Sequence, residues 1–204
     1  MDSLGDFLMR FATYILNHGH YFYVADVISP GKDLIRVDDK MIRKYRIPHC
    51  RQTRKNRRDR GKASIHYVRF RNAFVLIASK GRSPFFDHEQ WADIREEPIY
   101  FSGYSIGIRA GKSCIRIQGK RWIPLKNQFL GKAYCDIKSL QKSYDLITPF
   151  RFRGIIEQME QLRKQINNKR RRASLPLLQF WDWRRGAEGK EQAKGAMVSG
   201  LIDG

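Results

Sequence analysis

The segment from Arg43 to Lys62 constrains the fold of this chain most strongly, because it has almost nothing to bury. It carries ten basic residues and a single acid, Asp59, and residues 51–62 contain no apolar side chain. Such a segment forms either a solvated loop or a helix that is polar all round. A polyanion would relieve the repulsion between its like charges. The rest of the chain must therefore supply the hydrophobic core and present this segment at its surface.

The charge of the whole chain favours a partner that carries phosphates. The 204 residues have a formal net charge of +20, and a second basic run, Arg163–Arg172, has six basic residues and no acid. A pI near 10.2 with clustered charge is typical of proteins that bind nucleic acid. An anionic membrane would instead require a basic helix with a strong apolar face, which residues 51–62 lack. We therefore expect a nucleic-acid partner, no membrane, and an accessory or structural role among the proteins of a ribonucleoprotein or mobile-element system.

The predicted nucleic-acid contacts come from both basic runs and from a strand between them. Arginine binds phosphate oxygens bidentately, so charge density matters more here than residue order. RNA is favoured over DNA, because no groove-reading motif is recognised and arginine-rich segments become ordered on structured RNA. The predicted contact residues are Arg43, Lys44, Arg46, Arg51, Arg54, Lys55, Arg57, Arg58, Arg60, Lys62, Arg69, Arg71, Lys169, Arg170, Arg171 and Arg172.

Hydrophobic periodicity predicts an α+β fold, with an antiparallel sheet of about five or six strands between N-terminal helices and a C-terminal helical region. The apolar stripe of residues 152–172 marks the most regular helix. We expect helices over 2–17, 33–45, 125–135, 137–147 and 152–172, and strands over 20–28, 64–71, 73–79, 99–101, 104–110 and 114–118.

These elements divide the chain into three regions. Residues 1–120 are expected to form an α+β core domain that carries a basic insertion, 46–63, and residues 121–185 a helical region. The glycine-rich residues 186–204 have little pattern and are expected to form a flexible tail.

The cysteines and the N-terminus bear on cellular location. Cys50, Cys114 and Cys135 are widely spaced and include no CxxC pair, so neither a zinc site nor a disulfide framework is indicated. A sparse, odd cysteine count fits a reducing compartment. The N-terminus has no signal-peptide pattern, and the longest apolar run is too short to cross a bilayer. We therefore expect a cytoplasmic protein.

Aromatic residues beside the cations have two interpretations. Tyr21, Phe22 and Tyr23 on one predicted strand could stack on unpaired bases. So could Tyr67 and Phe70 on another strand. Core packing uses aromatics at the same frequency, so both interpretations stay open. Trp181 and Trp183, beside two arginines, are expected to anchor the C-terminal segment.

Two enzymatic alternatives remain. The first is a metal-dependent nuclease, because two or three carboxylates and a histidine can hold Mg²⁺ for phosphodiester hydrolysis. The candidates are an acidic cluster, with Asp87, His88 and Glu89 foremost, followed by Asp93, Glu96 and Glu97, and Asp26 from the first strand. The same acids could equally stabilise a helix N-terminus. No cofactor is expected outside this alternative.

The second enzymatic alternative is a nicking protein. His18-Gly19-His20 resembles the His-X-His metal site of single-strand-nicking replication and transposition enzymes, with Tyr134 or Tyr144 as the nucleophile. In those enzymes the middle residue is bulky and apolar. A glycine there suggests a helix end instead.

Overall fold

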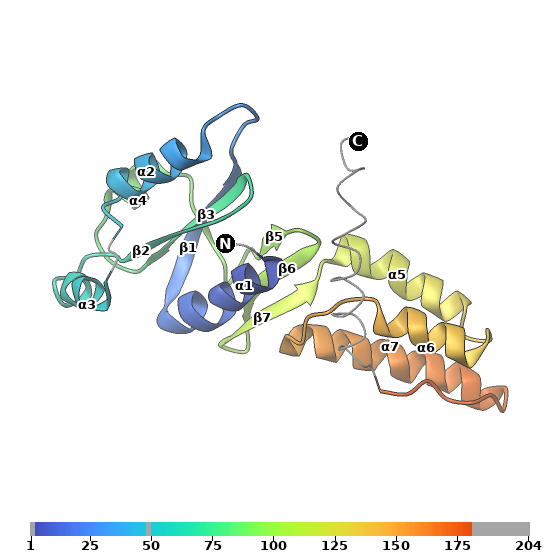
Figure 1. Ribbon diagram of the computed structural model, residues 1–204. Coiled ribbons are helices and arrows are strands. Elements are labelled where there is room, and N and C mark those ends of the chain that lie inside the picture. Colours follow the sequence, from blue (N-terminus) through green and yellow to red (C-terminus); the bar gives the residue numbers. More distant parts are fainter. Residues whose placement is uncertain (1–2, 48–49, 181–204) are drawn as a thin grey trace. The chain divides into compact units, whose positions relative to one another are not determined.

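The computed structural model describes residues 3–47 and 50–180 and divides the chain into two compact units (Figure 1). The first unit ends at Ile115 and the second begins at Arg116. Helices and antiparallel sheets are both present, so the predicted α+β class is confirmed. The predicted tail, 186–204, lies outside the described residues.

The larger sheet of the first unit has four strands in the order β2-β3-β1-β4, and each neighbouring pair is antiparallel. Residues Phe74–Ala78 of β3 are all buried, as expected of a central strand that is apolar on both faces. The strands are β1 (His20–Val27), β2 (Ile65–Phe70), β3 (Ala73–Ser79) and β4 (Ala92–Asp93).

A smaller sheet has three strands in the order β5-β6-β7. The predicted strands therefore form two sheets rather than one. Ala110 and Gly111, which join β6 to β7, have φ values of 49° and 70°, and positive φ at both positions is what a type I′ hairpin turn requires. The strands are β5 (Ile99–Phe101), β6 (Tyr104–Arg109) and β7 (Lys112–Ile117).

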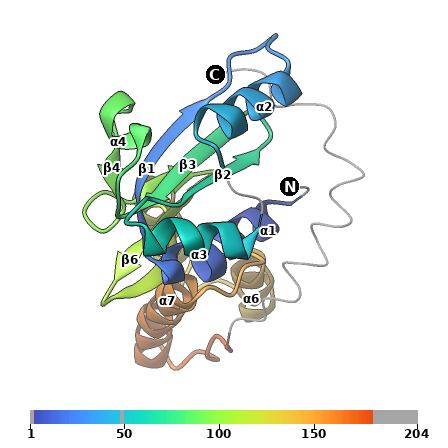
Figure 2. The same ribbon diagram turned by 90° about the vertical axis from the view of Figure 1, so that its left-hand side faces the viewer.

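Two helices cover one face of the four-stranded sheet (Figure 2). α2 (Leu34–Lys44) packs Leu34, Val37 and Met41 against the core, and α4 (Pro84–His88) contributes the buried Phe85. Asp33 caps α2 by accepting hydrogen bonds from two backbone amides of its first turn, at 2.9 and 3.3 Å. The spacing that predicted a helix over 33–45 is therefore the spacing of its buried face.

The N-terminal helix lies on the other side of this sheet and is less regular than the predicted helix over 2–17. α1 (Leu4–Met9) continues as a π-helical stretch, Arg10–Ile15, and a 3₁₀ turn, Leu16–His18. The Phe7 ring lies 6.2 Å from that of Phe70 on β2 and stacks 4.3 Å from that of Phe101 on β5. α1 therefore packs against both sheets of the first unit.

The described residues of the second unit include three helices, α5 (Gly119–Gly131), α6 (Ile137–Asp145) and α7 (Arg153–Arg172). The predicted stripe of α7 is buried at Ile155, Met159, Leu162 and Ile166. α5 begins earlier than predicted and runs through Pro124, which costs the helix one backbone hydrogen bond.

Candidate nucleic-acid interface

The basic segment folds as a helix, α3 (Arg51–Asp59). Its N-terminus is capped by Cys50, whose Sγ accepts a hydrogen bond from the Thr53 amide at 3.4 Å. Arg57 and Arg58 lie in its last turn, where positive charge is favoured by the helix dipole. Of the two forms that the sequence allows, the structure takes the helix that is polar all round.

Backbone contacts fasten the C-terminal end of α3 to the first unit. Gly61 turns the chain with a φ of 66°, and the Arg82 amide donates to its carbonyl oxygen at 2.9 Å. The Ala63 amide in turn donates to the Arg82 carbonyl at 3.1 Å. Gly81 lies so close that an added Cβ would be 2.6 Å from the Ala63 nitrogen, so a side chain at residue 81 would disturb this attachment.

The cations of α3 and its C-terminal turn divide by exposure. Arg54 and Arg57 are half-buried against the first unit, whereas Lys55, Arg58 and Arg60 are exposed. The exposed three form no ion pair with a described residue. Lys62, just beyond the helix, is exposed as well. The exposed cations are the ones that a phosphate backbone could reach.

α2 presents a second basic face, which sequence reasoning found only in part. Arg36, Lys40 and Arg43 recur at helical spacing on its exposed side. An open depression of about 480 Å³ lies along this side, lined by Arg36, Asp39, Lys40, Arg43 and Lys44. The ion pairs of Arg36 with Asp33 (3.5 Å) and Arg43 with Asp39 (3.8 Å) join strongly exposed groups, so they contribute little. The i, i+4, i+7 spacing of these cations could have identified the face.

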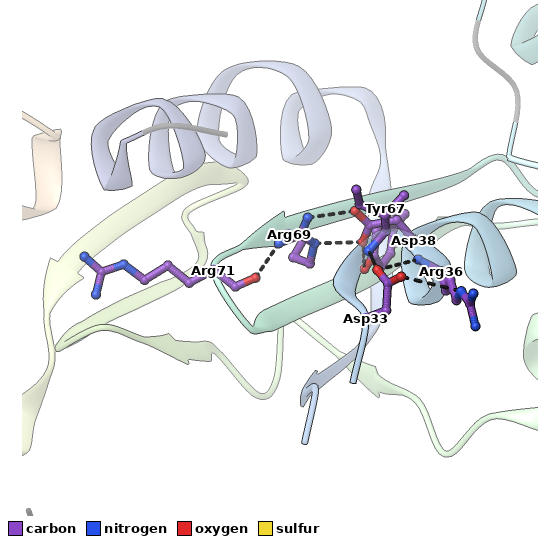
Figure 3. A network of polar contacts seen from close by, with 7 residues as sticks. Asp33, Arg36, Asp38, Tyr67, Arg69 and Arg71 are labelled. Carbon is purple, nitrogen blue, oxygen red and sulfur yellow. Dashed lines mark hydrogen bonds and ion pairs between the residues drawn. The ribbon is translucent and has the colours of Figure 1, made fainter. Parts of the chain in front are cut away.

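Arg69 was predicted to contact nucleic acid, but it has a structural partner instead (Figure 3). Its Nε and Nη2 donate to the two carboxylate oxygens of Asp38 on α2 at 2.7 and 2.8 Å, and the Tyr67 hydroxyl donates to Asp38 at 2.6 Å. Burial alone would raise the pKa of Asp38, but these hydrogen bonds outweigh it and hold that pKa below its usual value. Arg69 therefore stabilises the packing of α2 on β2. Arg71, by contrast, is exposed.

Lys44 is also engaged within the first unit. Its Nζ lies 2.8 Å from a carboxylate oxygen of Glu89, and the Tyr45 hydroxyl donates to the same oxygen. The hydrogen bond to Glu89 raises the pKa of Lys44. Burial would raise the pKa of Glu89, but the bonds from Lys44 and Tyr45 lower it overall. This contact ties the end of α2 to the segment after α4.

The residues of the proposed Mg²⁺ site do not converge. Asp87 and His88 are exposed, whereas Glu89 is held by Lys44 and Tyr45. The Asp26 carboxylate accepts a hydrogen bond from the next backbone amide at 2.7 Å. Across residues 3–47 and 50–180, no three His, Cys, Asp or Glu side chains are arranged to hold a metal ion.

The histidines form a different arrangement from the predicted pair. His18 is exposed and ends the 3₁₀ turn, and Gly19, with a φ of 80°, forms the expected helix end. His20 is buried and packs edge-on against His66 of β2, 4.6 Å away between ring centroids. Burial, together with nearby groups that include His20 and Arg54, lowers the pKa of His66 to about 3. Sequence reasoning missed His66, because nothing local marks its contact with His20.

The two candidate tyrosine nucleophiles differ in their surroundings. Tyr144 is buried, and its hydroxyl donates to the Met159 carbonyl at 2.7 Å. Burial raises its pKa well above the usual range. Tyr134 is exposed, with the Lys169 ammonium 5.9 Å from its ring centroid.

The second basic run is only partly available. The Arg170 side chain is 1 % exposed, and its guanidinium donates to the carbonyls of Ala133 (2.7 Å), Cys135 (2.9 Å) and Pro176. A phosphate cannot reach it, so its predicted contact is wrong. Lys169 is half-buried, whereas Arg171 and Arg172 are exposed.

The predicted stacking residues serve mainly the core. Tyr23 is buried, and the Tyr67 hydroxyl is bonded to Asp38. Phe70 packs on Phe7, and Phe22 packs edge-on against Phe86. Trp181 and Trp183 lie outside the described residues.

Within the described part of the chain, every helix is too short or too polar to cross a membrane. The sequence matches no protein-family model and no curated protein, and the structure matches no solved structure.

Proposed function

We propose that this protein binds nucleic acid by placing the exposed cations of α3, and of the adjoining basic face of α2, against the phosphate backbone. The observation that carries the proposal is that α3 is a helix without an apolar residue, fixed to the first unit at its C-terminal end. A helix of this composition gains nothing from burial in the protein's own core. Its exposed cations repel one another until a polyanion neutralises them.

Additional support comes from what surrounds these cations. Among the predicted contacts, Arg69 and Lys44 are paired with carboxylates, whereas Lys55, Arg58 and Arg60 are exposed and unpaired among the described residues. The protein thus pairs Arg69 and Lys44 with carboxylates where elements pack together and leaves Lys55, Arg58 and Arg60 unpaired among the described residues. Unpaired cations of this kind fit a surface where the phosphates of a ligand supply the opposite charge.

The choice between RNA and DNA depends on a further argument. The prediction of RNA rested on two reasons, the lack of a groove-reading motif and the ordering of arginine-rich segments on structured RNA. An exposed helix has the form of a groove-reading element, so the first of these reasons no longer favours RNA. A metal-dependent nuclease remains the alternative function, and no observation in the described residues favours it.

The test is the salt dependence of binding, measured by fluorescence polarisation with a labelled duplex of mixed sequence. The test variant changes Lys55, Arg58, Arg60 and Lys62 to Ala. If all four cations contact phosphates, the slope of log affinity against log salt should shrink by about 3.6 for a duplex and about 2.8 for a single strand.

A matched control removes the same charge from the second unit. It changes Lys120, Arg121, Lys138 and Lys142, all exposed on α5 and α6, to Ala. The control should keep most of the parental slope. If both variants lose affinity equally, overall charge rather than α3 would account for binding, and the proposal would be overturned.

A further inference from the structure

We propose that α3 enters the major groove of duplex DNA as a recognition helix, with Gln52 and Asn56 contacting an adenine edge. The inference rests on the proposed function and adds the class of nucleic acid and the residues that select the sequence. It concerns a face of α3 on which no predicted contact residue lies.

The orientation of α3 follows from its exposure pattern. Gln52 and Asn56 are four residues apart, so they lie one above the other on the same side of the helix. Both are exposed, whereas Arg54 and Arg57 are half-buried and lie on roughly the opposite side. The outermost face of this helix therefore carries the two amides and one acid, the exposed Asp59 three residues after Asn56, and no cation.

The two side-chain amides are hydrogen-bonded to each other, and this bond orients them for contact with a base. The Gln52 Nε2 donates to the Asn56 Oδ1 at 3.0 Å. With respect to the described residues, this bond leaves the Gln52 Oε1 as an acceptor and the Asn56 Nδ2 as a donor. In the major groove, adenine presents the complementary set, a donor at N6 and an acceptor at N7.

The flanking cations lie where the groove walls would be. Viewed along the helix axis, Lys55 lies to one side of the amide pair and Arg60 to the other, and both are exposed. An α-helix with its side chains is about 10–12 Å wide, and the major groove of B-DNA is about 12 Å wide. Phosphate contacts on both walls would position the helix, and the amides would read the base.

Two features argue against other nucleic acids at this face. The major groove of A-form RNA is too narrow and deep for side chains to read. The residues of α3, RQTRKNRRD, include no aromatic on which an unpaired base could stack. Duplex DNA is the form that an amide-centred, cation-flanked helix fits.

The experiment begins with the full-length protein and a pool of duplex DNA whose central base pairs are randomised. Sequences retained by the parent protein should be enriched in adenine at one or more positions. Affinity is then measured for the enriched duplex and for the same duplex with 7-deazaadenine, which lacks the N7 acceptor but still pairs with thymine. The parent should lose roughly 5- to 150-fold in affinity on this single-atom change.

Matched variants show whether the two amides are responsible. The double variant Gln52→Ala, Asn56→Ala should bind the adenine and 7-deazaadenine duplexes equally, with its phosphate-driven binding retained. A control, Asn127→Ala with Gln128→Ala, removes two exposed amides from α5 and should keep the parental discrimination. All residues changed are exposed, so thermal melting should stay level.

Each outcome bears on the inference separately from the proposed function. Duplex binding without adenine enrichment, or discrimination that survives in the amide variant, would overturn the inference while leaving phosphate binding in place. Binding that is confined to structured RNA would overturn it as well. An unchanged salt slope in the variant lacking Lys55, Arg58, Arg60 and Lys62 would count against the proposed function itself.

Discussion

α3 and the last turns of α7 have nearly the same charge density but opposite relations to the rest of the protein. α3 carries its cations on a helix without apolar residues, and Lys55 and Arg58 among them are exposed. The last turn of α7, Lys169–Arg172, follows a continuous apolar stripe and contains a fully buried arginine. Whether a basic helix packs into the core therefore depends on the apolar residues in its other turns and not on its cations.

The buried arginine shows how the second unit uses charge for structure. After α7 the chain folds back along the helix, and Leu178 is buried. The Asn167 side chain bonds both the carbonyl and the amide of Leu178, at 2.9 and 2.8 Å. Arg170 supplies donors to three further carbonyls. A guanidinium with several carbonyl partners satisfies buried backbone groups that would otherwise cost free energy.

The largest effect is expected from disrupting the buried apolar stripe, the feature that distinguishes α7 from α3. Met159→Asp places a charge at a position that is 0 % exposed, and we expect it to destabilise the second unit by about 4 kcal/mol or more. Chemical denaturation followed by circular dichroism measures the change. Gln161→Asp, at an exposed position of the same helix, should change the free energy of unfolding by less than about 0.5 kcal/mol. Equal effects at residues 159 and 161 would show that the stripe is not buried.

The next prediction compares the loss of stability when a buried arginine and an exposed arginine are each replaced. Arg170→Met leaves three carbonyls without their donor, and we expect a loss of about 2–4 kcal/mol of stability. Arg58→Met removes an exposed cation and should leave stability within about 0.5 kcal/mol of the parent. Affinity for nucleic acid should respond in the reverse order. If Arg58→Met destabilised the protein more than Arg170→Met, the division into structural and ligand-facing cations would be wrong.

Local patterns in the sequence predicted most of the elements. Alternation of apolar and polar residues predicted the strands, and the stripe of Ile155, Met159, Leu162 and Ile166 predicted α7. The start of α5 was predicted too far along the chain, because a proline judged from local sequence alone breaks a helix. In the structure, the rest of the helix outweighs the cost of Pro124.

What the sequence could not supply were contacts between distant residues. The division of the strands between two sheets depends on pairing across long loops, which local pattern does not encode. Asp38 with Arg69, Lys44 with Glu89, and His20 with His66 each join residues that are far apart in sequence. Counting charges therefore found the basic helix but could not tell engaged cations from available ones.

A smaller effect tests whether the backbone contacts between the Arg82 loop and Ala63 attach α3 to the first unit. Gly81→Ala would place a Cβ 2.6 Å from backbone at residue 63 and impose a φ of 138° on alanine, so we expect a loss of about 2–3 kcal/mol. Gly61→Ala has a φ of 66° but nothing within 4 Å of its Cβ, and about 1 kcal/mol is expected. Thermal melting measures both changes. Similar losses would mean that the contact between the Arg82 loop and Ala63 does not fasten α3.

The smallest effect concerns pH, and it arises where α3 meets the sheet. The pKa of His66 is about 3 in the folded protein and near its ordinary 6.5 in the unfolded chain. Because the folded pKa is the lower one, the neutral histidine stabilises the fold fully above pH 6.5, and this contribution is lost progressively as pH falls toward 3.

Between pH 6.5 and 5.5, we expect the free energy of unfolding to fall by about 1 kcal/mol from this residue. His66→Asn should reduce that slope in urea denaturation at a series of pH values, whatever the variant's absolute stability. His88→Asn, at an exposed histidine, should leave the slope unchanged. A parental slope that persists in His66→Asn would mean that other groups cause the acid sensitivity, and that His66 is not held neutral beside the cations of α3.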